Sequence, residues 1–288
     1  MTEMQSIFDT DCARFLKRRL LIGHLSTLHT HSIRDQFVVM ILRLAYIALS
    51  VLCAFPLHVK AEQARLAVAA NFADAAREFS VVYSRQSGHR IEISTASTGK
   101  LYAQIRNGAP FDALLSADAA TPRKLVAEGL ADGKTIHDYA IGRLTLWSRD
   151  RERVKNGETF LRTGQIDRLA IANPELAPYG AAAREVLLHV RRWDELQQRL
   201  VMGENVGQAT QFVVTGAAPL GLLPRSLVLE ARKTHPGSAW DIPAAWHAPI
   251  VQTAVLLDHG RANAAARGFL QFLRSRPVRN RIRALGYE

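Results

Sequence analysis

The sequence predicts an α/β protein of two lobes, each lobe a mixed sheet flanked by helices. From residue 65 onward, short apolar strands alternate with sharp turns and amphipathic helices, an order typical of parallel or mixed sheets covered on both faces. Residues 62–288 hold about eight such strands, enough for one unusually large sheet or two smaller ones. Because no Gly/Ser-rich linker is present, we expect short hinge segments near 141–144 and 248–251.

The individual elements follow from hydrophobic periodicity and turn residues. A buried strand over 65–70 precedes apolar residues at helical spacing over 72–83. Pro122 stands at the first helical position of a segment that ends at Gly129. Further strands are predicted over 90–95, 113–116, 144–147, 168–172, 201–202, 220–223 and 251–257, and further helices over 100–107, 180–190, 206–215, 263–274 and 277–285. The first lobe is assigned to 62–142 and 250–288, and the second to 143–249.

The composition is that of an ordinary globular protein. The chain has 288 residues, is 48% hydrophobic and 22% charged, and carries a formal net charge of +11. These values exclude a disordered, collagen-like or coiled-coil chain. The positive charges are interleaved with acidic and apolar residues, except in the Arg-rich stretch over 274–283. A nucleic-acid-binding protein would concentrate its charge and interleave it with aromatic residues, so no nucleic-acid partner is expected.

The first 61 residues are predicted to be an N-terminal extension with a signal peptide. The uncharged apolar run over 44–57 follows Arg43 and is shorter than the roughly 20 residues of a membrane-spanning helix, but it suits a signal h-region. Small residues before the site predict cleavage after Ala61, with Met40 as the candidate true start. The alternative is a membrane anchor, because 37–42 is also apolar.

The motifs of common enzyme classes are missing from the sequence. Both cysteines precede the predicted cleavage site, so the mature chain has no disulfide and no cysteine nucleophile. Motifs of serine hydrolases, zinc proteases and dinucleotide-binding proteins are not found. The segment 98–100 resembles the end of a phosphate-binding P-loop, but Ser94 stands where that loop needs Gly. The histidines of the predicted mature chain show no metal-ligand spacing. We therefore predict neither an enzyme nor a cofactor.

Four predicted helix starts carry small or polar residues directly after strands. They lie at 69–71, 96–99, 173–180 and 203–206, two in each half of the chain. The first N–H groups of a helix lack internal partners and carry a partial positive charge. In open α/β sheets such turns face a common crevice, so these four could surround an anion with neutral donors. The alternative is that Asn71, Ser97, Thr98 and Asn205 only cap their own helices.

Five segments of the sequence resemble a known family. The segments that carry the resemblance are LAVAANF (66–72), STGKLYAQIRNGAPFDALLSAD (97–118), AIANPELAPYGAAAREVL (170–187), GENVGQATQFVVTGAAPLG (203–221) and HAPIVQTAVLL (247–257). They are similar, in order and over essentially all of 64–288, to the periplasmic molybdate-binding proteins of bacterial ABC importers. The resemblance implies a two-lobed periplasmic-binding-protein fold of type II with the ligand in the interlobe cleft. It also implies a periplasmic monomer that delivers molybdate or tungstate to membrane permease subunits.

The resemblance also implies a set of ligand contacts. In the family, neutral hydroxyl, amide and backbone N–H donors hold the oxyanion, so molybdenum is bound only as that anion. The matching positions are Asn71, Ser97 or Thr98, Tyr179 and the N–H of Val206, with the backbone of Ala70 as a further candidate. Two departures are visible: some members have Thr where this chain has Ala70, and some use a Tyr where it has Pro224.

A site of neutral donors selects for a fully deprotonated anion. Without an acceptor carboxylate, molybdate is favoured over hydrogen phosphate, whose proton would find no partner. Glu175 and Glu204 flank two of the loops, and we expect Glu204 to cap its helix or face away from the cleft. The nearest alternative function is binding of sulfate, thiosulfate or another tetrahedral oxyanion on the same fold. An enzyme on a similar scaffold and a transcriptional effector-binding domain are more distant alternatives.

Overall fold

The computed structural model describes Met40 and residues 61–288. The predicted signal h-region and the residues just before the predicted cleavage site lie outside the described part of the chain. In that described part, no helix combines the length and the apolar character needed to cross a bilayer.

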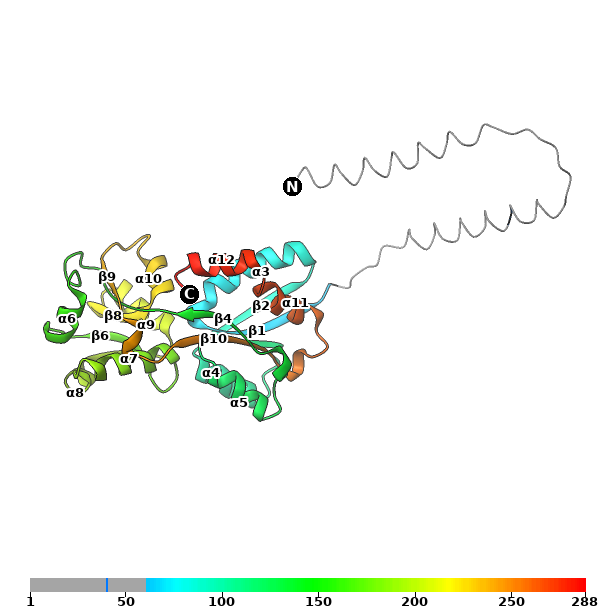
Figure 1. The fold of residues 1–288 in the computed structure, drawn as a ribbon, viewed down its shortest axis with the longest axis horizontal. Coiled ribbons are helices and arrows are strands. Elements are labelled where there is room, and N and C mark those ends of the chain that lie inside the picture. Colours follow the sequence, from blue (N-terminus) through cyan, green and yellow to red (C-terminus); the bar gives the residue numbers. More distant parts are fainter. Residues whose placement is uncertain (1–39, 41–60) are drawn as a thin grey trace, which may run out of the picture. The chain divides into compact units, whose positions relative to one another are not determined.

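Two five-stranded sheets organise residues 61–288 into two lobes (Figure 1). Lobe 1 is built on the strand order β2-β1-β3-β10-β4 and lobe 2 on the order β7-β6-β8-β5-β9. The strands of lobe 1 are β1 (Gln63–Ala69), β2 (Arg90–Ala96), β3 (Ala113–Ser116), β4 (His137–Gly142) and β10 (Ile250–Leu256). Those of lobe 2 are β5 (Leu144–Ser148), β6 (Leu169–Ala172), β7 (Leu200–Gly203), β8 (Leu220–Pro224) and β9 (Ser238–Asp241).

Both sheets are mixed, and helices flank each of them. In lobe 1, β1 pairs in parallel with β2 and β3, whereas β10 runs antiparallel to β3 and β4. The helices of lobe 1 are η1 (Ala70–Phe72), α3 (Ala73–Ser87), α4 (Thr98–Arg106), α5 (Ala120–Ala127), η2 (Gly133–Thr135), η5 (Asp258–Gly260), α11 (Ala264–Leu273) and α12 (Arg276–Ala284). Those of lobe 2 are α6 (Gly157–Thr163), α7 (Pro178–His189), α8 (Trp193–Leu196), η3 (Gln197–Arg199), α9 (Val206–Val214), α10 (Arg225–Ala231) and η4 (Ala244–Trp246). The predicted two-lobed α/β fold class is confirmed.

The alternation of side chains along β1 explains how helices cover both faces of the lobe 1 sheet. Leu66 and Val68 face a core shared with α3, α11 and α12, where Phe72, Phe79 and Phe269 pack. The intervening Ala67 faces the opposite core, which is shared with α4 and α5. Each lobe 1 face therefore has its own apolar layer, and the turn after β1 is anchored in one of them through Phe72.

Two strands and three α-helices were missing from the sequence prediction. These are β4, β9, α6, α8 and α10. The strand β4 is paired with β10 from far along the chain, and β9 is a four-residue strand paired with β5. Short segments of this kind are fixed by tertiary pairing more than by local periodicity. The first strand also ends one residue early, because Ala70 already belongs to η1.

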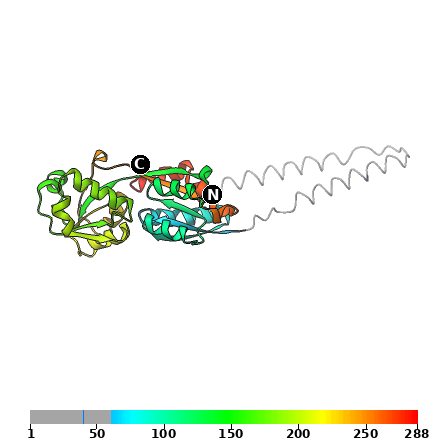
Figure 2. The same ribbon diagram turned by 90° about the horizontal axis from the view of Figure 1, so that it is seen from below.

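Two connections join the lobes. The chain leaves the lobe 1 sheet at the end of β4, enters the lobe 2 sheet at β5, and returns to lobe 1 at the start of β10, where Ile250 is paired with Gly142. The chain end is tied to the same place: Ile141 N donates to Glu288 O at 2.7 Å, and Glu288 N donates to Ile141 O at 2.9 Å. The turned view also shows β4 leading from one lobe to the other (Figure 2).

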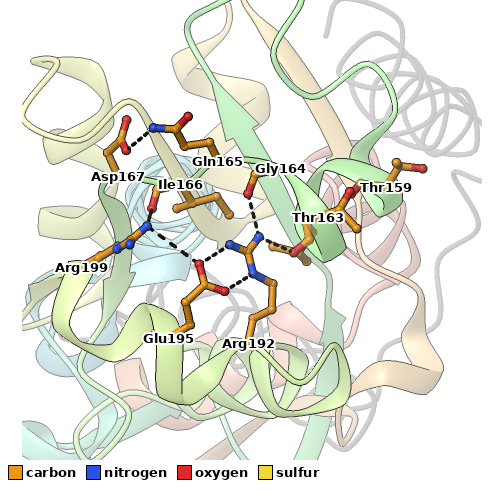
Figure 3. Close-up of polar contacts among 10 residues, drawn as sticks. Thr159, Thr163, Gly164, Gln165, Ile166, Asp167, Arg192, Glu195 and Arg199 are labelled. Carbon is orange, nitrogen blue, oxygen red and sulfur yellow. Dashed lines mark hydrogen bonds and ion pairs between the residues drawn. The ribbon is translucent and has the colours of Figure 1, made fainter.

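A buried arginine braces lobe 2 (Figure 3). The Arg192 side chain donates to the backbone oxygens of Leu161 and Gly164, at 3.2 and 2.8 Å, and to both carboxylate oxygens of Glu195. Arg199 adds a bond to Ile166 O at 2.9 Å. Because these carbonyls belong to α6 and to the connection from α6 to β6, the two arginines hold this part of the chain against α8.

Candidate functional site

The four predicted helix starts lie around one region between the lobes. The small residues Ala69 and Ala117 of lobe 1 belong to the same apolar cluster as Ala177, Tyr179 and Val206 of lobe 2. The helix α9 also contacts η1. The turns that follow strands in the two lobes therefore face each other, as expected for the carboxyl ends of strands in open sheets.

Ser97 and Thr98, which the sequence could not separate, have different surroundings. Both residues are 2% exposed. Thr98 Oγ1 accepts a hydrogen bond from Ala117 N at 3.2 Å and so ties α4 to the end of β3. Ser97 is the N-cap residue of α4, yet its Oγ is buried and has no hydrogen-bond partner within residues 61–288. Because a buried hydroxyl without a partner is unfavourable, Ser97 is the better candidate for a ligand contact.

Asn71 is held by residues from the far end of the chain. Its Nδ2 donates to Gln252 Oε1 at 2.8 Å and to Tyr287 OH at 3.3 Å, and Tyr287 OH donates to Asn71 O at 2.7 Å. Gln252 Nε2 donates to the carbonyls of Ala117 and Ile250, which fixes which end of its amide faces Asn71. Both amide hydrogens of Asn71 are therefore engaged, and the donor it can offer a ligand is the backbone N–H in the first turn of η1.

Tyr179 enters the same region from lobe 2. Tyr179 follows Pro178, the first residue of α7, and is 2% exposed. Its hydroxyl lies so close to Gly142 that a Cβ there would overlap it. Burial raises the pKa of Tyr179 well above its usual value, and the neighbouring Tyr287 and Tyr139 add to this shift. The hydroxyl thus stays protonated at neutral pH and able to donate a hydrogen bond.

Val206 offers a backbone donor. It is the first residue of α9, and the preceding Asn205 caps the helix by accepting a bond from Gln208 N at 3.1 Å. Asn205 therefore caps its own helix, which is the alternative that the sequence left open for this residue. The cap leaves the N–H of Val206 without an intrahelical partner, at the positive end of the helix dipole.

The two carboxylates beside these loops both have cationic partners. Glu204 Oε1 lies 2.5 Å from Nζ of Lys100, which belongs to lobe 1. The expectation that Glu204 caps its helix or faces away was wrong, because Asn205 occupies the cap and the longer Glu204 side chain reaches the other lobe. Glu175 pairs with Arg184 at 3.6 Å, and both side chains are exposed.

Sequence reasoning missed several residues that shape this region. Gln252 and Tyr287 contact Asn71 from 181 and 216 positions away, and Gly142 leaves space for Tyr179. A polar Gln inside the apolar strand β10 was the one local signal that could have pointed to such a role. Among residues 61–288, no group of three or more His, Cys, Asp or Glu side chains is arranged to hold a metal ion. The donor set suits an anion.

Two cavities reach this region from the surface. One, of about 580 Å³, is lined by Ala70, Asn205 and residues of α3, α9 and α10. The other, of about 360 Å³, is lined by Gly99, Ala117, Ala177 and residues of the α5 and α7 starts. Of the candidate contacts, Ala70 lines the first cavity, and the second cavity lies at Gly99, two residues after Ser97.

Comparison with known proteins identifies the family of this chain. Residues 64–288 match the family model of the bacterial extracellular solute-binding protein. The chain is 39% identical to the molybdate-binding protein ModA of Rhodobacter capsulatus, covering 85% of this chain and 96% of the relative. It is 38% identical to ModA of Azotobacter vinelandii, covering 79% and 90%. The solved structure of the Azotobacter vinelandii periplasmic molybdate-binding protein aligns with a TM-score of 0.74 at 36% identity, covering 78% and 98%. The chain thus belongs to the bacterial extracellular solute-binding proteins.

Proposed function

We propose that this protein binds molybdate, and also tungstate, in the cleft between its lobes and delivers the anion to the membrane permease of an ABC importer. It acts in the periplasm as a monomer, after removal of its signal peptide. In this proposal, lobe 1 consists of residues 62–142 and 250–288, and lobe 2 consists of residues 143–249. Its relatives are named as molybdate-binding proteins, so the proposed activity is binding without covalent chemistry.

One observation carries the proposal most directly. Ser97 Oγ is buried and unpartnered at the interlobe region, so a ligand that accepts its hydrogen would remove the penalty of leaving it unpaired. The other proposed donors are the backbone N–H groups of Asn71 and Val206 and the Tyr179 hydroxyl, with the backbone of Ala70 as an additional contact. All of them are uncharged.

Neutral donors explain selection for a doubly deprotonated anion. Each hydrogen bond to a charged group contributes about 1.5–3 kcal/mol, so a handful of them supports tight binding after the cost of association. Hydrogen phosphate would bring a proton that needs an acceptor, and the carboxylates of Glu175 and Glu204 are already paired. The proposed site therefore disfavours hydrogen phosphate through its unpaired proton.

The test is a ligand panel on protein that has been stripped of bound anion. We expect molybdate and tungstate to raise the unfolding temperature and to give calorimetric binding isotherms with one site. Sulfate and phosphate should bind at least about tenfold more weakly, which corresponds to 1.4 kcal/mol. Tight binding of sulfate together with no response to molybdate would replace the proposal with the sulfate alternative.

A further inference from the structure

Two contacts join the lobes directly beside the candidate site. The backbone N–H of Gly99 donates to Leu176 O at 2.9 Å, from the start of α4 to the loop before α7. In the next position along α4, Lys100 Nζ lies 2.5 Å from Glu204 Oε1 in the turn before α9. The side chains of Lys100 and Glu204 are 49% and 45% exposed, so the pair lies at the rim of the cleft.

Neither charge of this pair is used within its own lobe. Among the described residues, Lys100 forms an ion pair only with Glu204, and Glu204 forms one only with Lys100. The cap of α9 is supplied by Asn205, so Glu204 has no local structural role through its carboxylate. A pair of this kind forms only when the two lobes are close together, and it therefore stabilises the closed arrangement alone.

The position of the pair also affects the charge felt by the ligand. Glu204 stands two residues before Val206, and Lys100 stands three residues after Ser97. Two backbone steps span less than about 8 Å, so an unpaired Glu204 carboxylate would repel a dianion at the start of α9. Lys100 neutralises that carboxylate while it joins the lobes.

We propose that Lys100 and Glu204 form an electrostatic latch that sets how long the closed, anion-loaded protein persists. This inference rests on the proposed oxyanion function. Lys100 has two favourable effects, since it holds the lobes together and screens Glu204 from the anion. Glu204 has one favourable effect and one unfavourable effect, since it holds Lys100 but repels the ligand. Removing each charge should therefore give unequal results.

Four variants measure this asymmetry. Lys100→Met should weaken molybdate binding about three- to fivefold, mostly through faster dissociation, in the range of a partly exposed ion pair. Glu204→Gln should change affinity by less than about twofold, because its two effects oppose each other. Lys100→Glu places two carboxylates face to face and should weaken binding by at least about tenfold. The charge-swapped Lys100→Glu/Glu204→Lys protein should recover affinity to within about threefold of the parent.

Calorimetry gives the affinities, and the release of radioactive molybdate into excess unlabelled molybdate gives the dissociation rates. The matched control is Lys155→Met, which breaks an exposed ion pair with Glu152 inside lobe 2 and should leave both quantities unchanged. Thermal unfolding of the ligand-free variants checks that each one folds.

The outcomes separate the latch from the proposed function. Recovery in the charge-swapped protein supports the latch, because a merely structural role for either side chain would not be restored by exchanging the charges. Equal affinity of Lys100→Glu and the charge-swapped protein overturns it. If the parent protein binds no molybdate, the proposed function is wrong. If the parent binds molybdate and Lys100→Glu binds it with the same affinity, only the latch is wrong.

Discussion

Two turns of lobe 1 face the cleft, and they differ in how far their polar groups are already used. The turn over 69–72 carries Asn71, whose amide and carbonyl groups are bonded to Gln252 and Tyr287. The turn over 96–99 carries Ser97, whose buried hydroxyl has no partner in the described part of the chain. Both turns place a polar residue within two positions of a strand end. The hydrogen bonds of the Asn71 side chain are formed within the protein, whereas the Ser97 hydroxyl forms none among residues 61–288.

This difference separates two roles that look alike in the sequence. A buried polar group normally has a hydrogen-bond partner, and one without a partner is a candidate for donating to a ligand. Asn71 instead uses its side chain to hold its own turn against β10 and the chain terminus. We therefore infer that Ser97 contacts the anion through its side chain, whereas the side chain of Asn71 positions a backbone donor.

The largest expected effect is that of Ser97→Ala on molybdate affinity. The substitution removes one hydrogen bond to a charged ligand, so affinity should fall by about 1.5–3 kcal/mol, or roughly 10- to 150-fold. The ligand-free protein should be no less stable, because the variant removes an unpartnered buried hydroxyl. Calorimetry and thermal unfolding of the ligand-free protein measure the two effects separately.

The neighbouring Thr98 provides the control for that variant. Thr98→Val keeps the shape of the side chain but removes the acceptor for Ala117 N. The unfolding free energy should drop by about 1–3 kcal/mol, while affinity changes by less than about threefold. If Thr98→Val weakened binding as much as Ser97→Ala, the distinction between these two residues would be wrong.

Alkaline pH should lower the free energy of unfolding through Tyr287, the residue that contacts Asn71. Burial raises the pKa of Tyr287 from 10.0 to about 12. Below pH 10 the hydroxyl is protonated in both the folded and the unfolded chain, so it adds no pH dependence. Between pH 10 and 12 the unfolded chain loses the proton first, so this group removes about 1.4 kcal/mol of stability per pH unit.

Denaturant unfolding at a series of pH values from 9 to 11.5 measures this slope. The parent should lose stability more steeply than Tyr287→Phe above pH 10, by about 1.4 kcal/mol per unit. Tyr139 and Tyr179 are also buried with raised pKa values, and they add the same dependence to both proteins. Parallel pH profiles for the parent and the variant would mean that Tyr287 is not buried as described.

Local patterns predicted most of the architecture but less of the site. Strand and helix periodicity identified the elements that bury an apolar face, and the four helix starts followed from residues next to them. The roles of Ser97 and Thr98 depend on where Ala117 N lies, which is set by packing of α4 against β3. Likewise, Gln252 and Tyr287 reach Asn71 only because β10 and the chain terminus return to lobe 1. Such long-range contacts leave little local signal.

The contact of the Glu204 side chain also could not be predicted from local sequence. Its place before a helix favoured a capping role, which the shorter Asn205 fills instead. The partner of Glu204 is Lys100, 104 positions earlier and in the other lobe. Helix-cap statistics describe one helix end at a time, so they cannot anticipate a contact that exists only when the two lobes meet.

A smaller loss of affinity than that of Ser97→Ala is expected for Tyr287→Phe at neutral pH. Tyr287 OH donates to Asn71 O and accepts from Ser226 Oγ of lobe 2 at 3.1 Å. The variant loses both bonds, but Gln252 still accepts a hydrogen bond from the Asn71 side-chain amide, so the turn remains partly held. Molybdate affinity should fall by about two- to tenfold, in line with the loss of one hydrogen bond acting indirectly. The matched control is Tyr102→Phe, which removes an exposed hydroxyl bonded to Glu128 and should leave affinity unchanged. A Tyr287→Phe protein that binds like the parent but unfolds more easily would show that this bond braces the fold without orienting the donor of Asn71.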